Sequence, residues 1–188
     1  MKYYYSIFIL SFLLNCTSKS QTNSIPKQKS WNAIVEIPAG TNLKYEYNYK
    51  SNSFEVEIIE GKKRTINYLP YPGNYGFIEN TYMDPSRGGD GDALDVLIIS
   101  ESVSQGEKIP INPVGILKLL DKGQEDHKII AVPKNSNQTY INDSVPNSVK
   151  TILKTWFCNY KGAGKMEFIS WGNKISALEE IKKWSITK

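Results

Sequence analysis

The stretch Gly88-Gly89-Asp90-Gly91-Asp92-Ala93-Leu94-Asp95-Val96-Leu97 joins an acidic, glycine-rich segment to an apolar one. Carboxylates held this close repel one another unless a cation lies among them, water surrounds them or one of them carries a proton. The glycines allow sharp backbone turns, and the apolar residues 96–99 predict a buried strand behind the loop. Because oxygen ligands select hard cations, the stretch favours a site for Mg²⁺, Mn²⁺ or Ca²⁺. A solvated surface turn is the alternative that this stretch alone leaves open.

The overall composition is that of an ordinary globular chain. The 188 residues are 40% hydrophobic and 22% charged, which suits one domain with a substantial core. The net charge of +4 comes from scattered basic residues, which argues against nucleic acid as a partner. A single histidine and two cysteines exclude zinc sites built from several histidines or cysteines.

The N-terminal residues predict export rather than a part of the fold. Lys2 precedes an apolar run, 6–14, that is too short to span a bilayer as a helix, and a polar segment follows it. This is the pattern of a signal peptide and a flexible linker. We therefore divide the chain into a signal peptide at 1–15, a tether at 16–30 and a folded domain at 31–188.

The segment Leu13-Leu14-Asn15-Cys16 resembles a bacterial lipoprotein box, in which the cysteine is lipidated. It predicts a protein attached to the cell envelope through Cys16 and facing the periplasm or the exterior. A secreted soluble protein is the alternative. If Cys16 is lipidated, Cys158 has no disulfide partner, and it is expected to be a small buried residue in a helix.

Short segments with the composition of β-strands occupy 32–37, 44–49, 54–59, 96–99, 114–120 and 128–132. The last two predict a hairpin with Asp121 and Asp126 at its mouth. Alternation in 44–49 places three polar residues, beginning with Lys44, on one face and three tyrosines on the other. That pattern alone favours water, rather than a cavity, on the polar face.

Helix signals appear only late in the chain. Asp143-Ser144-Val145-Pro146 predicts a helix start with proline just inside the helix, and Gly162 marks its end. A capping box at 176–179 predicts a last short helix that ends near Trp184. Shaped loops are expected at 69–76 and 84–91. Strands followed by helices predict an α+β, mainly β fold, a small closed barrel with helices packed outside.

Taken together, these segments resemble the family I soluble inorganic pyrophosphatases over about residues 32–171. The family signature, Asp-x-Asp-Pro-x-Asp before an apolar strand, appears here as Asp90-Gly91-Asp92-Ala93-Leu94-Asp95. Further matching segments are Glu36-Ile37-Pro38-Ala39, Lys44-Tyr45-Glu46, Asn74-Tyr75-Gly76, Val114-Gly115-Ile116-Leu117-Lys118 with Asp121, Glu125-Asp126 with Lys128, and Tyr160-Lys161.

The resemblance implies a five-stranded OB-like closed barrel that hydrolyses pyrophosphate to two orthophosphates by a metal-activated water. Several Mg²⁺ ions per site are implied, with Mn²⁺ as an alternative, and bacterial members of the family are often hexamers. This chemistry needs the charge of the phosphates neutralised and the attacking and leaving oxygens held in line, which paired metals and basic side chains provide.

The resemblance also implies a role for each matching polar residue. Asp92 matches the general base near the attacking water. The implied metal ligands are Asp90, Asp95, Asp121 and Asp126. The implied substrate-binding residues are Lys44, Arg64, Tyr75, Lys128, Tyr160 and Lys161, supported by the acidic residues Glu36 and Glu46. These roles turn Lys44 and Glu46 toward the barrel mouth, against the expectation from alternation alone.

Three positions depart from the family pattern or are ambiguous. Ala93 replaces the common proline, which removes some stiffness from the loop. Lys63 fits the basic phosphate-contacting position without a gap and Arg64 fits it with one; we favour Arg64 because its planar fork suits bidentate contact. His127, the single histidine, is expected to be a solvent-facing turn residue.

Two other functions fit the sequence less well than an enzyme. A calcium-binding surface lipoprotein with an EF-hand fails because Asp95 stands where the loop needs glycine, and a calcium repeat fails because Ala93 stands where aspartate is needed. An inactive relative retained as a scaffold is disfavoured, since an inactive site has no physical reason to keep repelling carboxylates together.

Overall fold

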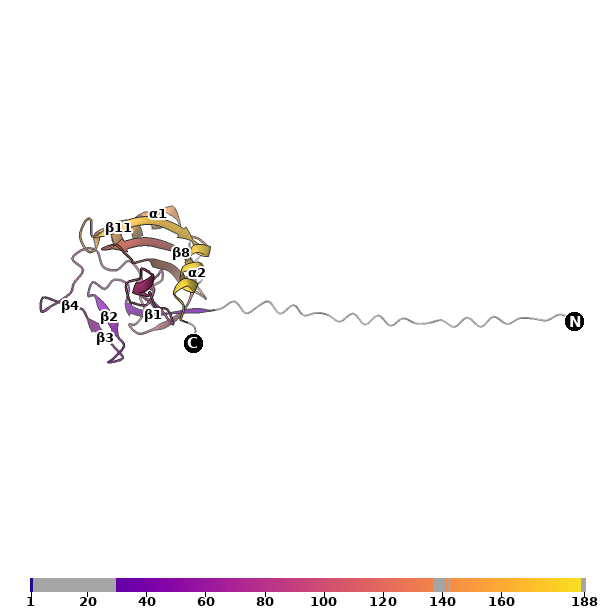
Figure 1. Ribbon diagram of the computed structural model, residues 1–188, viewed down its shortest axis with the longest axis horizontal. Helices are drawn as coiled ribbons and strands as arrows, with labels where there is room; N and C mark the ends of the chain where they lie inside the picture. Colours follow the sequence, from indigo (N-terminus) through magenta and orange to yellow (C-terminus); the bar gives the residue numbers. More distant parts are fainter. Residues whose placement is uncertain (2–29, 137–140, 142, 187–188) are drawn as a thin grey trace.

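The computed structural model describes Met1, residues 30–136, Ile141 and residues 143–186. The predicted lipidation site Cys16, almost all of the predicted signal peptide and most of the tether lie outside these residues. The folded region consists mainly of β-strands with two α-helices, which confirms the predicted class (Figure 1).

The central sheet is built from seven strands: β1 Trp31–Ile37, β6 Asn74–Ile78, β7 Asp95–Ile98, β8 Lys108–Asp121, β9 Gln124–Glu125, β10 Lys128–Pro133 and β11 Met166–Asn173. Their order is β1-β6-β7-β10-β8-β11, β9 pairs with β8, and β7 with β10 is a parallel pair. Since β8 also pairs with β1, the pairings run round five strands and return to the first, as in an OB-like barrel. The barrel is not strictly closed, because β8 pairs with β1 over only four residue pairs and then continues past the ring to β11.

Strand β8 is twice the length predicted for it. The segment 114–120 was predicted as a strand, whereas β8 has 14 residues and includes Pro110 and Pro113. Pro113 pairs with Ala131 of β10, beside a shift in register between Ile130 and Ala131. Such an irregularity accommodates proline, which has no backbone N–H to donate. Because prolines are usually excluded from strands, their presence made this part of β8 unpredictable from the sequence.

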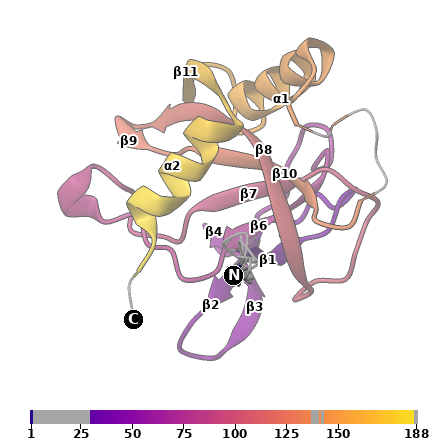
Figure 2. The ribbon, with the colours of Figure 1, turned by 90° about the vertical axis from the view of Figure 1, so that its right-hand side faces the viewer.

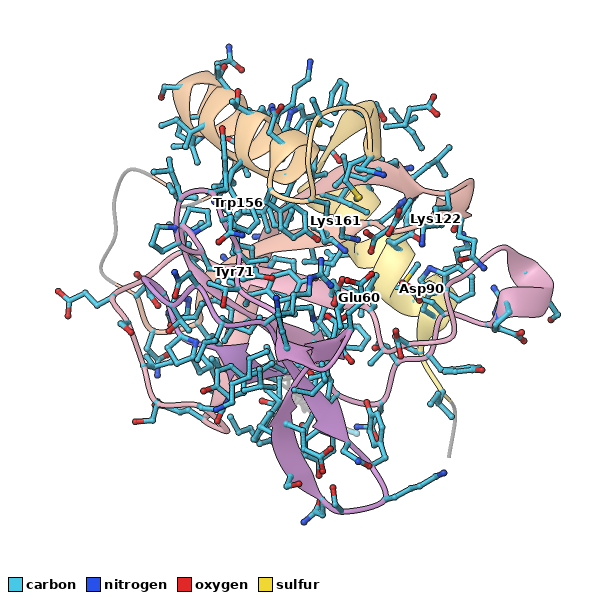
Figure 3. The ribbon with its side chains drawn as sticks, turned by 90° about the vertical axis from the view of Figure 1, so that its left-hand side faces the viewer. Glu60, Tyr71, Asp90, Lys122, Trp156 and Lys161 are labelled. Atoms are coloured by element: carbon cyan, nitrogen blue, oxygen red, sulfur yellow. The ribbon has the colours of Figure 1, made fainter. Side chains whose placement is uncertain are left out.

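The hydrophobic core has two parts on opposite faces of the sheet. Alternating residues of β8 point to each side, so that Leu117 belongs to one cluster and Ile116 to the other. In the first cluster the rings of Tyr71 and Trp156 lie with centroids 4.7 Å apart, and Figure 3 shows them together above the strands. Both clusters are buried, and each is covered by one of the helices.

Helix α1, Asn147–Asn159, packs on β11, and α2, Lys174–Trp184, crosses β8 (Figure 2). The starts of both helices differ from prediction. Pro146 is the N-cap of α1 rather than a helical residue. The N-cap of α2 is Asn173, whose Oδ1 accepts from the Ser176 backbone N–H at 3.0 Å, so the predicted capping box lies inside the helix. None of the described helices is long and apolar enough to cross a membrane.

Two small hairpins lie beside the barrel: β2 Tyr45–Asn48 with β3 Ser53–Val56, and β4 Ile58–Ile59 with β5 Lys62–Lys63. The prediction of one strand over 54–59 was therefore wrong. Glu57 lies between the two hairpins and bonds to both. Its N–H donates to the Lys44 carbonyl at 2.9 Å, next to the Tyr45–Val56 pair, and its carbonyl accepts from the Arg64 N–H at 2.8 Å, next to the Ile58–Lys63 pair.

The segment 69–76, predicted as an irregular loop, gives its last residues to β6. Gly76 is needed there for close approach of two strands rather than for a turn, since a Cβ would lie 1.9 Å from the Ile34 carbonyl oxygen. Strand β11 was not predicted at all. The loop at 84–91 contains a short 3₁₀ helix, Pro85–Arg87.

Candidate active site

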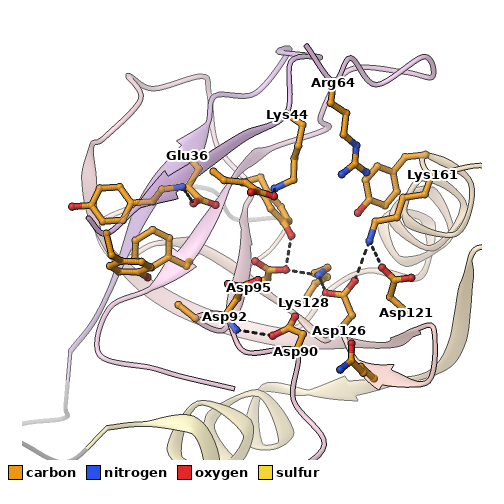
Figure 4. Close-up of a pocket in the computed structure, with 18 residues that line it drawn as sticks. Glu36, Lys44, Arg64, Asp90, Asp92, Asp95, Asp121, Asp126, Lys128 and Lys161 are labelled. Atoms are coloured by element: carbon orange, nitrogen blue, oxygen red, sulfur yellow. Dashed lines mark hydrogen bonds and ion pairs between the residues drawn. The ribbon is translucent and has the colours of Figure 1, made fainter. Parts of the chain in front are cut away.

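A cavity of about 270 Å³ opens at one end of the barrel and contains every predicted site residue that the structure describes (Figure 4). Its lining includes Glu36, Lys44, Glu46, Arg64, Tyr75, Asp90, Asp92, Asp95, Asp121, Asp126, Lys128, Tyr160 and Lys161. Tyr47, Tyr49, Phe77, Ala93 and Gln124 also line it. Residues from seven segments of the chain therefore meet in one place.

The ends of strands position three of the charged groups. Asp95 is the first residue of β7, Asp121 the last of β8 and Lys128 the first of β10. A residue at a strand end is held by the sheet while its side chain reaches beyond it, which gives a rigid base to a polar site. The predicted hairpin mouth with Asp121 and Asp126 is thus the floor of this cavity (Figure 4).

The acidic loop is fixed by its own backbone. Gly91 has φ of +91°, a left-handed conformation that side chains rarely adopt, and Asp90 accepts a hydrogen bond from the Asp92 backbone N–H at 3.0 Å. Gly89 packs against the backbone of Met83, where a Cβ would approach to 2.4 Å. These contacts hold Asp90 and Asp92 at the cavity wall.

Lysine ammonium groups lie among the carboxylates. Lys128 is 1% exposed and forms ion pairs with Asp95 and Asp126. Lys161 lies 2.6 Å from Asp121 and 3.7 Å from Asp126. The Tyr75 hydroxyl donates to Asp95 at 2.5 Å. Carboxylate and ammonium groups therefore alternate in the cavity, and the ammonium groups belong to lysine side chains of this protein.

The electrostatics of the aspartates differ from one another. Burial raises the pKa of Asp90 from 3.8 to about 6, and the neighbouring carboxylates of Asp95 and Asp126 add to this. Burial and Asp95 also raise the pKa of Asp92. For Asp126, burial would raise the pKa, but Lys128 and Lys161 outweigh it, so the pKa lies below its ordinary value.

Glu36 lies on the opposite wall and is 8% exposed. Burial raises its pKa from 4.5 to about 7, while Lys44 opposes the rise and Asp95 adds to it. Its Oε1 accepts from the Tyr47 backbone N–H at 2.8 Å, which joins β1 to the β2–β3 hairpin. Glu46, by contrast, keeps a side chain that is 57% exposed, 3.6 Å from Lys44.

The basic part of the cavity is formed by Lys44, Arg64 and Lys161 (Figure 4), and Tyr160 also lines the cavity. The Arg64 guanidinium lies 2.5 Å from Glu57 and reaches the cavity, whereas Lys63 is an exposed residue of β5 outside the lining. The geometry thus favours Arg64 over Lys63 for contact with a ligand in this cavity.

The donor set fits a hard divalent cation. The groups that converge are carboxylate oxygens. Burial, and to a smaller extent their mutual repulsion, raises the pKa values of Asp90 and Asp92, and a cation would relieve that repulsion. Among the described residues that line the cavity, the acidic ligand groups are all carboxylates, which are the ligands that hard cations prefer.

A second cluster lies outside the cavity and contains the single histidine. Ligand atoms of Glu125, His127 and Glu180 lie within 4.8 Å of one another. Lys183 lies 2.5 Å from Glu125, and the Trp184 indole N–H donates to Glu180 at 2.6 Å. His127 is 4% exposed with Nδ1 3.1 Å from the Leu119 carbonyl oxygen, so its prediction as a solvent-facing residue was wrong.

The cysteine prediction was also only partly right. Cys158 lies in α1 as expected and is a free thiol, but it is half-buried rather than buried. It packs at the edge of the first core cluster and does not line the cavity.

Comparisons with protein families, with curated proteins and with solved structures all match this chain to the same family. A family model described as inorganic pyrophosphatase matches residues 33–187. The chain is 35% identical over 161 residues to an inorganic pyrophosphatase of Saccharolobus solfataricus, covering 81% of this chain and 88% of the relative. It is 38% identical over 161 residues to that of Sulfolobus acidocaldarius, covering 80% and 87%. A crystal structure of an inorganic pyrophosphatase from Neisseria gonorrhoeae superposes with a TM-score of 0.68 at 29% identity, covering 82% of this chain and 88% of that one.

Proposed function

Because this chain belongs to the inorganic pyrophosphatase family and hydrolyses pyrophosphate to two orthophosphates, we propose that the cavity at the barrel end is its active site. The single observation that carries this proposal is the meeting of 13 residues from distant segments, acidic and basic, in one cavity. A polyanionic substrate held by metals needs both kinds of charge in one place.

The enzyme is metal-dependent, as its family is, and we propose Mg²⁺ as the metal, with Mn²⁺ as a substitute. Asp90, Asp95, Asp121 and Asp126 would hold the ions, and the hydrogen bond from Tyr75 would orient Asp95. Bound there, the metals supply charge neutralisation and a water whose pKa is lowered toward neutrality.

Asp92 is proposed as the general base that accepts a proton from the attacking water. It lies in the same loop as Asp90 but makes no ion pair among the described residues, and its raised pKa suits a group that must take up a proton. Glu36 and Glu46 would support the acidic wall from the opposite side.

The basic residues would bind the phosphoryl groups. Lys44, Arg64 and Lys161 provide positive charge, and the Tyr160 hydroxyl provides a neutral donor. Lys128 is engaged with Asp95 and Asp126, and we propose that it turns part of its hydrogen bonding to substrate when metals neutralise those carboxylates.

An assay of phosphate release with Mg²⁺ tests this assignment. Asp92→Asn should lower kcat by about 100-fold or more while leaving the free energy of unfolding close to that of the unmodified chain, because the side chain keeps its shape. Asp143→Asn, at an exposed carboxylate outside the cavity, is the matched control and should keep full activity. Normal turnover by Asp92→Asn would refute the proposed role.

We further propose that the protein is lipidated at Cys16 and held at the cell envelope, facing the periplasm or the exterior. We also propose that it forms homo-oligomers, and by analogy with the family the expected oligomer is a hexamer. The lipoprotein-like segment before Cys16 supports the first point. Replacing Cys16 by alanine should move the protein from the membrane fraction to the soluble fraction. Light scattering of the purified protein measures the oligomeric state, and a monomer at micromolar concentration would refute the second point.

A further inference from the structure

The acidic loop that carries Asp90, which is labelled in Figure 3, has three glycines around that residue. Gly89 precedes Asp90, and Gly88 and Gly91 both have φ of +91°. Glycine loses more conformational freedom on folding than any other residue, so this backbone is ordered only as firmly as its contacts hold it. The contacts of the loop therefore decide how well the Asp90 carboxylate is positioned.

Backbone hydrogen bonds hold the base and the middle of the loop. The Met83 N–H donates to the Asp92 carbonyl at 2.7 Å, and the Gly91 N–H donates to the Met83 carbonyl at 2.9 Å. The Gly88 carbonyl accepts from the Glu125 N–H at 3.1 Å, which ties the loop to β9. The tip of the loop, residues 85–88, is exposed, so packing contributes little to its order.

The side chain of Arg87 connects this tip to α2. Its Nη2 donates to the Lys183 carbonyl oxygen at 3.1 Å, and its guanidinium lies over the Trp184 ring, 4.8 Å from the ring centroid. A planar guanidinium can stack on a ring and donate hydrogen bonds from its edge at the same time. Arg87 therefore makes two different contacts with the last turn of α2.

The last turn of α2 is a rigid support for these contacts. Trp184 is 1% exposed, and its indole N–H donates to Glu180 at 2.6 Å. The Trp184 carbonyl also accepts from the Tyr82 N–H at 2.9 Å, a backbone bond that does not involve Arg87. Loss of the Arg87 side chain should therefore free the loop tip without displacing the helix.

We propose that Arg87 is a positioning residue for the metal site, because it anchors the loop to α2 three residues before Asp90. The inference rests on the proposed role of Asp90 as a metal ligand. A carboxylate on an ordered loop loses less conformational entropy when it binds a cation, so removing the anchor should weaken metal binding. Arg87 does not line the cavity, so turnover at saturating metal should be nearly unchanged.

The test compares the full chain with Arg87→Gln, which removes the charge and the planar fork from an exposed position. In the metal-free protein, hydrogen exchange followed by mass spectrometry should be about tenfold faster in peptides covering 84–92. The Mg²⁺ concentration at half-saturation, measured by calorimetry without substrate, should rise by about tenfold. That change equals about 1.4 kcal/mol, in the range of one exposed cation–π contact with one hydrogen bond. The kcat for pyrophosphate at saturating Mg²⁺ should change by less than about twofold.

The matched control is Lys182→Gln. It removes a positive charge from the same turn of α2, at an exposed side chain that does not line the cavity. Hydrogen exchange at 84–92 and the Mg²⁺ concentration at half-saturation should both stay as they are in the unmodified chain. A change in either that equals the effect of Arg87→Gln would mean that net charge, rather than the anchor, is the cause, and would overturn the proposal.

The other outcomes separate the anchor from the proposed active site. Unchanged exchange at 84–92 or an unchanged Mg²⁺ requirement in Arg87→Gln would overturn the positioning role, as would equally faster exchange throughout β8. Asp90→Asn tests the underlying site: Mg²⁺ binding as tight as in the unmodified chain would refute Asp90 as a ligand, whatever Arg87→Gln shows. Should Arg87→Gln unfold, Arg87→Lys keeps the cation but not the planar fork, and the same comparison applies with a smaller expected change.

Discussion

The hairpin of β8 and β10 carries polar clusters on opposite sides, and four consecutive residues serve both. Asp126 and Lys128 point into the active-site cavity, whereas Glu125 and His127 point toward α2 and meet Glu180. This division follows from the two-residue period of extended chain, which sends neighbouring side chains to opposite faces. A single run of sequence thereby builds two sites that differ in purpose.

The two clusters differ in how their charges are satisfied. On the α2 side, Glu125 binds Lys183, Glu180 accepts from Trp184 and His127 contacts the Leu119 carbonyl, so the chain itself completes the cluster. In the cavity, burial and neighbouring carboxylates raise the pKa values of Asp90 and Asp92. Ionisable groups that lie close together are therefore not enough to indicate a metal site. Carboxylates with raised pKa values around an open cavity are a stronger indication.

The largest predicted effect is a difference in activity between variants of two adjacent residues, Asp126 and Glu125. Asp126→Asn should lower kcat/KM for pyrophosphate by about 1000-fold, because it removes one of the charges that we propose to hold the metals. Glu125→Gln changes the neighbouring carboxylate on the other face, and it should change kcat/KM by less than about threefold. Equal losses in both variants, measured by phosphate release, would contradict the assignment of the two faces.

Removing the buried cation should destabilise the cavity when metal is absent. Lys128→Met leaves Asp95 and Asp126 without their partner, which should lower the free energy of unfolding by about 3–5 kcal/mol in the presence of a chelator. Excess Mg²⁺ should reduce this loss, since it neutralises the same carboxylates. Urea denaturation with and without Mg²⁺ measures the difference, and an identical loss in both conditions would count against metal binding by these residues.

Glu36 gives the cavity a pH dependence of stability opposite in sign to that of the α2-side cluster, where burial lowers the pKa of His127. Its raised pKa means that the folded state is favoured below pH 4.5 and loses that advantage as pH rises through about 7. Glu36→Gln should therefore stabilise the metal-free protein by about 3 kcal/mol at pH 8 and by much less at pH 5. Equal melting-temperature shifts at the two pH values would contradict the burial of this carboxylate as the cause.

The smallest effect is expected on the side of α2. Glu180→Ala removes the acceptor of the Trp184 indole and should lower the free energy of unfolding by about 1–2 kcal/mol. Pyrophosphate turnover should change by less than about twofold, because the cluster lies outside the cavity. Loss of activity without loss of stability would show that the cluster takes part in the reaction.

The sequence was most informative where chemistry constrains residue type. The acidic stretch and its matching segments placed every described site residue in one cavity, including Arg64 in preference to Lys63. Family resemblance, not alternation, gave the inward orientation of Lys44. Alternation was misleading in that segment because Tyr47 and Tyr49 also line the cavity, and Tyr49 lies beyond the end of β2, where the strand period no longer applies.

The sequence was least informative where an answer depends on distant packing. The burial of His127 depends on α2 covering that face of the hairpin, and nothing near His127 indicates the helix. The extension of β8 through two prolines depends on a register shift in β10. Gly76 lies in a strand because β1 approaches it closely. No pattern in the sequence near Gly76 indicates that approach.

The extent of β8 has a consequence for how the molecule opens. This strand pairs with β1, β9, β10 and β11, and it ends at Asp121 in the cavity. Its central amides, such as those of Ile116 and Leu117, can reach solvent deuterium only when several strand pairs separate together. Scaffold and catalytic cavity should thus form one cooperative unit, so the protein would lose its active site and its slowest-exchanging amides in the same transition.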